Sequence, residues 1–225
     1  MPPNSETIHP LGVPGSIKLV VFDCDGVMFH SEKANLAFYQ EVLRRAGVPP
    51  LPDDARTAAH AMASVQLFER YFGEQPELLA RIKTTAGKTP YTPFFELMTP
   101  RAGLFEVLGE LRQTAGYAIA MATNRSATFE ELLERFELAH LFDYAVGARG
   151  AIRPKPHPDM LIDCSERFRV SPAEIVFVGD QPSDAECARR AGTRFVGIGA
   201  VAEQCETAVQ RLCELPALLA GLSSD

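Results

Sequence analysis

Residues 17–26 read IKLVVFDCDG, a short apolar run that ends directly in two aspartates and a glycine. A run this short and rich in β-branched residues, closed by a turn, is typical of a buried strand. Side chains alternate along an extended chain, so Asp23 and Asp25 point to one side and Cys24 to the other. Two carboxylates this close repel each other unless a cation or a shared proton relieves them. The end of this strand is therefore a candidate site of chemistry, although an isolated Asp-x-Asp also fits a solvated acidic turn.

The composition predicts a globular protein with a good core. The chain has 225 residues, 46% of them hydrophobic, enough for one core and a small accessory domain. Lys and Arg total 22 against 29 acidic residues, and the net charge of −7 disfavours nonspecific attraction to nucleic acid or anionic membranes. We find neither a basic stripe with interleaved aromatic residues nor a run of about 18 apolar residues. We therefore expect no nucleic-acid partner and no membrane.

The cysteines and the N-terminal residues bear on location. The five cysteines form no Cys-x-x-Cys pair and no histidine stands at metal-finger spacing, so neither a disulfide framework nor a zinc site is expected. This cysteine usage fits a reducing cytoplasm. Residues 1–16 contain four prolines and two glycines without the basic start and apolar stretch of a secretory signal, and we expect an N-terminal arm there.

A helical segment follows the first strand. Ser31 can cap a helix that ends at Gly47, and the pattern from about Asp53 to Lys88 stays helical without a convincing strand. A purely helical stretch of this length between a first strand and later strand–helix units predicts an inserted all-α cap domain, residues 31–90. The proline-rich segment 90–100 is expected to be the return hinge.

The rest of the chain alternates strands with helices. Strands are predicted at 117–122, 144–146, 175–178 and 194–198, with helices at about 104–111, 129–136, 158–168 and 186–191. This order predicts an α/β fold, a Rossmann-like parallel sheet with helices on both faces, formed by residues 17–30 and 91–225. Ligands of such sheets collect at the carboxyl ends of the strands.

Further polar residues stand at those predicted strand ends. Thr123-Asn124 closes one strand, where a hydroxyl and a backbone N–H make an anion site or a plain helix cap. Lys155 lies in RPKPHP, residues 153–158, where alternate prolines stiffen the backbone. Asp180 and Asp184 follow another strand in GDQPSD, residues 179–184.

Phosphoryl transfer explains why these residue types occur together. A phosphate monoester repels a carboxylate nucleophile, so the site needs a hard divalent cation held by oxygen ligands, which favours Mg²⁺. Asp23, Asp180 and the Asp25 carbonyl can supply these oxygens, while Lys155 and Thr123 orient the phosphate. Asp23 can attack phosphorus and form an aspartyl-phosphate, and Asp25 can act as the acid and then the base.

These motifs, Asp-x-Asp-Gly, a strand-terminal Thr, Lys-Pro and Gly-Asp-x-x-x-Asp, occur in an order that resembles the haloacid dehalogenase superfamily. The likeness runs from about Ile17 to Gly199 and is greatest to the phosphoglycolate phosphatase and β-phosphoglucomutase branch with a helical cap.

The resemblance implies a role for each motif residue. It makes Asp23 the nucleophile and Asp25 the acid and base. The remaining roles are phosphate binding by Thr123, Asn124 and Lys155, Mg²⁺ binding by Asp23, the Asp25 carbonyl and Asp180, and support of the metal site by Asp184. The carboxylate at Asp25 argues against dehalogenase chemistry, because the dehalogenases of this superfamily lack it.

The expected function is an Mg²⁺-dependent phosphatase of a small phosphorylated metabolite, of the phosphoglycolate or sugar-phosphate type. The first alternative is a phosphomutase, which returns the phosphoryl group to a sugar. A second alternative is a phosphate-binding regulator without turnover. The sequence leaves open whether the protein is a monomer or a homodimer.

Overall fold

The computed structural model describes residues 16–52, 55, 59, 62, 64–113, 116–126 and 128–222. These residues divide into two compact units. One comprises the described residues of 16–28 and 100–222, and the other those of 29–99. Nearly all of the predicted arm, 1–16, and most of the helical prediction over 53–63 lie outside the described residues. The predicted division into arm, core and cap with its boundaries stays a prediction, and we keep it as a proposal.

The first unit is built on a six-stranded sheet with the order β5-β4-β1-β6-β7-β8. All the strand pairs of this sheet are parallel. The strands are β1 Leu19–Phe22, β4 Ala118–Thr123, β5 Tyr144–Gly147, β6 Ile175–Gly179, β7 Arg194–Ile198 and β8 Ala208–Val209. The short β8 carries only two residues and was not predicted from the sequence.

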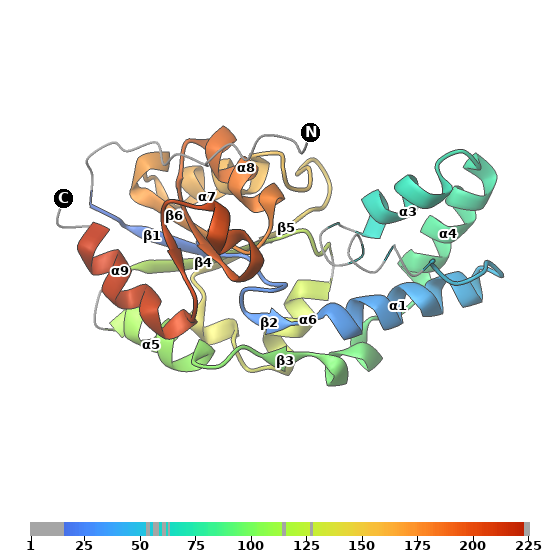
Figure 1. Cartoon of the computed structure of the whole chain (residues 1–225), viewed down its shortest axis with the longest axis horizontal. Coiled ribbons are helices and arrows are strands. Elements are labelled where there is room, and N and C mark those ends of the chain that lie inside the picture. The colour runs from blue at the N-terminus through green and yellow to red at the C-terminus, as the bar shows by residue number, and fades with distance from the viewer. Residues whose placement is uncertain are drawn as a thin grey trace. The chain divides into compact units, whose positions relative to one another are not determined.

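Helices flank this sheet on both sides. In Figure 1, α7 and α8 lie on one side of the strands and α5 and α9 on the other. The helices of this unit are α5 Leu104–Gln113, α6 Thr128–Arg135, α7 Asp159–Phe168, α8 Pro182–Ala191 and α9 Leu215–Leu222. Short 3-10 helices lie at η2 Ala139–Leu141, η3 Pro172–Glu174, η4 Gly199–Gln204 and η5 Leu212–Glu214. The predicted α/β fold with a parallel sheet is confirmed.

The central strands are apolar because they are covered on both faces. β1 and β6 are buried at every position, which explains their continuous runs of valine, leucine, isoleucine and phenylalanine. Alternate residues of these strands, such as Leu19 and Phe177, pack in one core cluster with Met160 and Ala188 of α7 and α8. β1 lies at the point where the chain moves to β4 on one side and to β6 on the other, which is where ligands of such sheets bind.

The second unit is helical. It contains α1 Glu32–Arg45, α3 Ser64–Phe72, α4 Pro76–Lys88 and the 3-10 helix η1 Thr92–Leu97. A two-stranded sheet of β2 Phe29–His30 and β3 Thr99–Pro100 lies where the chain enters and leaves this unit. The segment 90–100, expected as a hinge, is structured by η1, since Phe94 and Tyr91 pack their rings against Phe38.

Two details of this unit differ from the sequence-based expectation. Ser31 precedes α1, but its side chain makes no capping hydrogen bond and its buried hydroxyl has no partner. Val65, an apolar residue of α3, is 49% exposed, whereas Phe68 of the same helix is buried. The sequence pattern therefore predicted a helix here but did not predict which of its apolar residues are buried.

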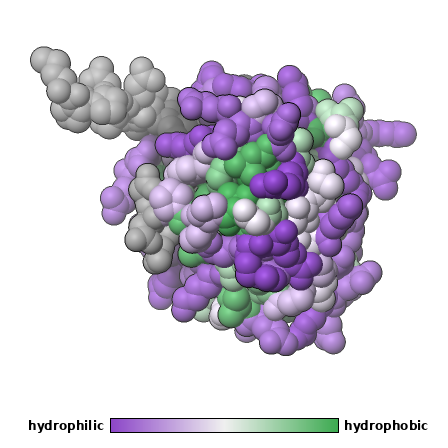
Figure 2. All heavy atoms as spheres, turned by 90° about the vertical axis from the view of Figure 1, so that its right-hand side faces the viewer, coloured by the Kyte–Doolittle hydropathy of each residue, from purple (hydrophilic) through white to green (hydrophobic). Residues whose placement is uncertain are grey.

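The face of the molecule shown in Figure 2 is mostly hydrophilic. On the face shown in Figure 2, hydrophilic residues predominate among those coloured, and hydrophobic residues gather in a small central area. Among the described residues, no helix has the length and apolar character needed to cross a membrane.

Phe177 tests the core assignment. It is fully buried on β6, whereas Phe105 on α5 is 45% exposed. We expect Phe177→Ala to lower the free energy of unfolding by about 3–5 kcal/mol, because the substitution removes apolar contacts and leaves a cavity. Phe105→Ala is the matched control, and we expect a change of about 0.5 kcal/mol or less. Denaturant unfolding measures both; similar losses would contradict the assignment.

Candidate active site

The candidate site lies at the carboxyl edge of the central strands. Asp23 follows the last residue of β1, Asp180 follows the last residue of β6, and Thr123 ends β4. Phe22 is paired in register with both Met121 and Val178 of the neighbouring strands. The parallel register therefore brings the polar residues that follow these strands to one edge of the sheet.

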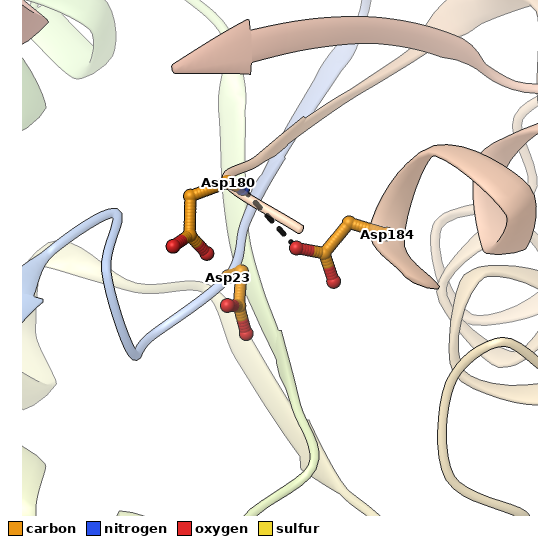
Figure 3. Close-up of side chains that lie close together, drawn as sticks. All are labelled: Asp23, Asp180 and Asp184. Atoms are coloured by element: carbon orange, nitrogen blue, oxygen red, sulfur yellow. Dashed lines mark hydrogen bonds between the residues drawn. The ribbon is translucent and has the colours of Figure 1, made fainter. Parts of the chain in front are cut away.

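Three carboxylates gather there. Each of Asp23, Asp180 and Asp184 offers an oxygen, and these oxygens lie within 4.8 Å of one another. Figure 3 shows Asp23 and Asp180 at the ends of their strands and Asp184 reaching toward them from the first turn of α8. All three are buried, with exposed fractions of 5% or less. Such a cluster needs positive charge nearby.

Lys155 supplies part of that charge. Its Nζ lies 2.6 Å from Asp23 Oδ1 and 2.6 Å from Asp184 Oδ1. It also lies 3.4 Å from the Ala122 carbonyl oxygen and 5.3 Å from the ring centroid of Phe177. The lysine is 3% exposed, so it is a buried cation fixed on several sides.

Burial and neighbouring charges shift the pKa values of the groups in this cluster. Burial raises the pKa of Asp23 well above its usual range, an effect that Lys155 opposes and the nearby carboxylates reinforce. Burial likewise raises the pKa of Asp184. Burial acts to lower the pKa of Lys155, but the Asp184 and Asp23 carboxylates more than offset it and raise that pKa. Lys155 thus contacts two of the three carboxylates of the cluster, Asp23 and Asp184.

Asp184 has a positioning role in this arrangement. Its Oδ2 accepts hydrogen bonds from the backbone N–H groups of Asp180 at 3.1 Å and Gln181 at 3.0 Å, while its Oδ1 contacts Lys155. Both oxygens are thus engaged in holding the turn and the lysine. Sequence analysis expected a helix only from residue 186; α8 instead begins at Pro182 and includes Asp184.

Thr123 and Asn124 lie beside this cluster. The Thr123 hydroxyl is buried and accepts a hydrogen bond from the Arg125 backbone N–H at 3.2 Å. The Asn124 side-chain oxygen accepts a hydrogen bond from the Lys155 backbone N–H at 2.8 Å. Asn124 therefore fixes the loop that carries the lysine, and the role of both residues in phosphate binding stays a prediction.

Asp25 has a partner that sequence analysis missed. The Arg125 guanidinium donates two hydrogen bonds to its carboxylate, from Nε at 2.8 Å and from Nη2 at 2.7 Å. Arg125 follows the predicted Thr123-Asn124 motif directly, but a surface arginine after a helix cap would give the same sequence. Because Arg125 and Asp25 are 100 positions apart in the sequence, no local pattern indicates that they pair.

The sequence of this chain matches a known protein family. Residues 20–198 match the family model described as "Haloacid dehalogenase-like hydrolase". The chain belongs to the haloacid dehalogenase-like hydrolase family. The resemblance stated from the motifs is thereby confirmed, and so is the expectation of an enzyme of this hydrolase superfamily.

Individual relatives agree with this family assignment. A phosphoglycolate phosphatase of Escherichia coli O157:H7 is 30% identical over 192 residues, which cover 84% of this chain and 69% of the relative. A haloacid dehalogenase superfamily hydrolase of subfamily IA from Geobacter sulfurreducens has 32% identity and a TM-score of 0.70, covering 92% of this chain and 100% of the solved one. A haloacid dehalogenase-like protein of Streptococcus pneumoniae shares the fold, with 17% identity, a TM-score of 0.73 and coverage of 89% and 97%.

The turn after Asp25 is fitted closely to the carboxylate cluster of this haloacid dehalogenase-like chain. Gly26 has φ +83°, and a Cβ placed on it would lie 2.0 Å from Asp180 Oδ2. Only glycine lets the backbone adopt this conformation and approach the carboxylate so closely. Gln181 donates a hydrogen bond to the same oxygen at 2.7 Å, which keeps it in place.

Gly26→Ala tests this close approach, with Gly47→Ala as its control. Gly47 also has positive φ, +66°, but a Cβ there would meet nothing within 4 Å. We expect Gly47→Ala to cost about 1–2 kcal/mol of stability for the backbone conformation alone. Gly26→Ala should cost about 1–3 kcal/mol more, because its methyl group displaces the buried Asp180 carboxylate. Thermal and denaturant unfolding compare the two; equal losses would show that Asp180 yields at no cost.

Proposed function

We propose that this protein is a Mg²⁺-dependent phosphatase that hydrolyses a small phosphate monoester through a covalent aspartyl-phosphate on Asp23. The observation that carries the proposal is the cluster of three buried carboxylates at the carboxyl edge of the sheet, two of which contact Lys155. The match to a hydrolase family and the printed name of the E. coli relative, a phosphoglycolate phosphatase, support the same reaction class. We extend it to phosphoglycolate-type or sugar-phosphate-type substrates.

The donor set fits Mg²⁺. The three aspartates of the cluster offer carboxylate oxygens as ligands, and hard divalent cations prefer oxygen ligands. Asp23, Asp180 and the Asp25 carbonyl would hold the ion, while Asp184 is already engaged with Lys155 and two backbone amides. When bound, Mg²⁺ would neutralise negative charge on its carboxylate ligands and on the phosphate.

The residues of this chain then have distinct tasks. In the first step an Asp23 carboxylate oxygen bonds to phosphorus, the bond from phosphorus to the ester oxygen breaks, and Asp25 gives its proton to that oxygen. In the second step water attacks phosphorus, the bond to Asp23 breaks, and Asp25 takes the proton from the water. Lys155 and Thr123 orient the phosphate oxygens and offset their charge.

Release of inorganic phosphate tests the reaction. We expect the purified protein to release phosphate from phosphoglycolate or from sugar phosphates, and Asp23→Asn to abolish the release while the protein stays folded. Acid quenching during turnover should trap a labelled phosphoryl group on the wild-type protein and none on Asp23→Asn.

Asp163→Asn is the control, because Asp163 on α7 accepts a hydrogen bond from Tyr144 at 2.6 Å and belongs to no part of the site. Its activity should stay within about twofold of wild type, the change expected away from the reacting groups. Transfer of the phosphoryl group to a second sugar without phosphate release would indicate the phosphomutase alternative. Full activity of Asp23→Asn would refute the proposed nucleophile.

Thermal unfolding tests the metal independently of turnover. At a Mg²⁺ concentration about 100 times Kd, we expect a stabilisation of about 2.7 kcal/mol, equivalent to roughly 5–10 °C in Tm. Asp180→Asn should lose most of this shift, since it removes one negative charge from the cluster, whereas Asp163→Asn should retain it. An equal shift in Asp180→Asn and wild type would contradict the assigned ligand.

A cytoplasmic location stays a prediction. All five cysteines are free thiols in the structure, and three of them are buried. The same holds for the expected lack of nucleic-acid and membrane partners, which rests on the net charge of −7.

A further inference from the structure

Arg125 forms a buried ion pair with the Asp25 carboxylate. Its side chain is 6% exposed and that of Asp25 is 19% exposed. Two parallel hydrogen bonds, Nε to Oδ2 and Nη2 to Oδ1, engage both carboxylate oxygens. The other bidentate arginine pairs, such as Arg189 with Glu186, involve arginines that are far more exposed, 58% in that case. This pair combines burial with contact to the predicted acid and base.

The geometry of the pair fixes direction as well as charge. A guanidinium fork holds a carboxylate in one plane, which a single ammonium group does not do. The fork itself is anchored, because the Arg125 backbone N–H donates to the Thr123 hydroxyl at the end of β4. On the other side, a Cβ on Gly147 of β5 would lie 2.3 Å from the Arg125 carbonyl oxygen, so the backbone packs closely against that strand. The orientation of the Asp25 carboxylate is thus tied to the sheet.

We propose that Arg125 is a positioning residue that aims the Asp25 carboxylate at the ester oxygen leaving the phosphorus. The inference rests on the proposed function, in which Asp25 passes a proton to that oxygen as the bond to phosphorus breaks. Arg125 touches neither phosphate nor metal in this role; it acts only through Asp25. Its contribution should therefore appear where transfer of that proton limits the rate.

Leaving-group dependence isolates this contribution. The leaving group of an alkyl phosphate such as phosphoglycolate is a strongly basic alkoxide, which needs a proton. The leaving group of p-nitrophenyl phosphate is a stable phenolate, which does not. General acid catalysis contributes about 10²–10⁴-fold in rate. We expect Arg125→Met to lower kcat on both esters unequally, with a loss on the alkyl ester at least about tenfold greater than the loss on the aryl ester. KM should change by less than about threefold, because orientation of the acid affects the transition state and not ground-state binding.

Two further variants make the test specific. Arg125→Lys keeps the charge but loses the fork, so it should recover part of the alkyl-ester kcat that Arg125→Met loses. Arg189→Met removes the exposed bidentate pair with Glu186 and should leave both kcat values unchanged. In an Asp25→Asn background, Arg125→Met should cause little additional loss on the alkyl ester, because the two residues act as one unit.

The outcomes separate the two proposals. Equal losses on both esters in Arg125→Met and Arg125→Lys, with Asp23→Asn inactive, would overturn the positioning role and leave the proposed function standing. Activity retained in Asp23→Asn would overturn both. If Arg125→Met does not fold, as judged by circular dichroism, the ester selectivity of Arg125→Lys decides the question in the same way.

Discussion

The site depends on the buried contact of the Lys155 ammonium with Asp23 and Asp184. This contact joins three parts of the chain, the end of β1, the loop after β5 and the first turn of α8. Loss of one partner from a buried ion pair leaves an uncompensated charge, which costs several kcal/mol in proteins. The carboxylates can therefore be buried together only while the lysine stays between them.

The surroundings of Lys155 are arranged to keep it there. Asn124 binds its backbone N–H, and Arg153 forms a bidentate pair with Asp159 across the same loop, at 2.7 and 2.8 Å. The Phe177 ring lies near the ammonium from the core side. The loop thus positions the cation before any substrate enters, which lowers the reorganisation that phosphoryl transfer would otherwise require.

The sequence predicted the sheet and the gathering of its strand ends well, because both follow from local signals. Apolar runs such as 175–178 identify buried strands, and the parallel order of the strands places the residues that follow them at one edge. The shorter elements were missed because they lack such a period. β8 has two residues, and α9 is almost wholly apolar, so neither shows a clear alternation. Residues 90–100 were expected to be a hinge from their prolines. The structure forms η1 there, with aromatic rings packed against α1, and the hinge role stays a prediction.

The pairing of Asp25 could not be predicted for a different physical reason. Asp23 and Asp25 belong to one motif and are equivalent in sequence, but the fold gives them different cations. Asp23 meets an ammonium group, which supplies charge without fixing a plane, and in the proposed mechanism a carboxylate oxygen of Asp23 attacks phosphorus. Asp25 meets a guanidinium fork, which holds the plane of the carboxylate, and in the proposed mechanism this sets the direction in which Asp25 exchanges a proton. Neighbouring carboxylates acquire separate roles when their environments differ, and here the difference lies in which cation each one faces. That distinction arises only when residues 100 positions apart are brought together by the sheet.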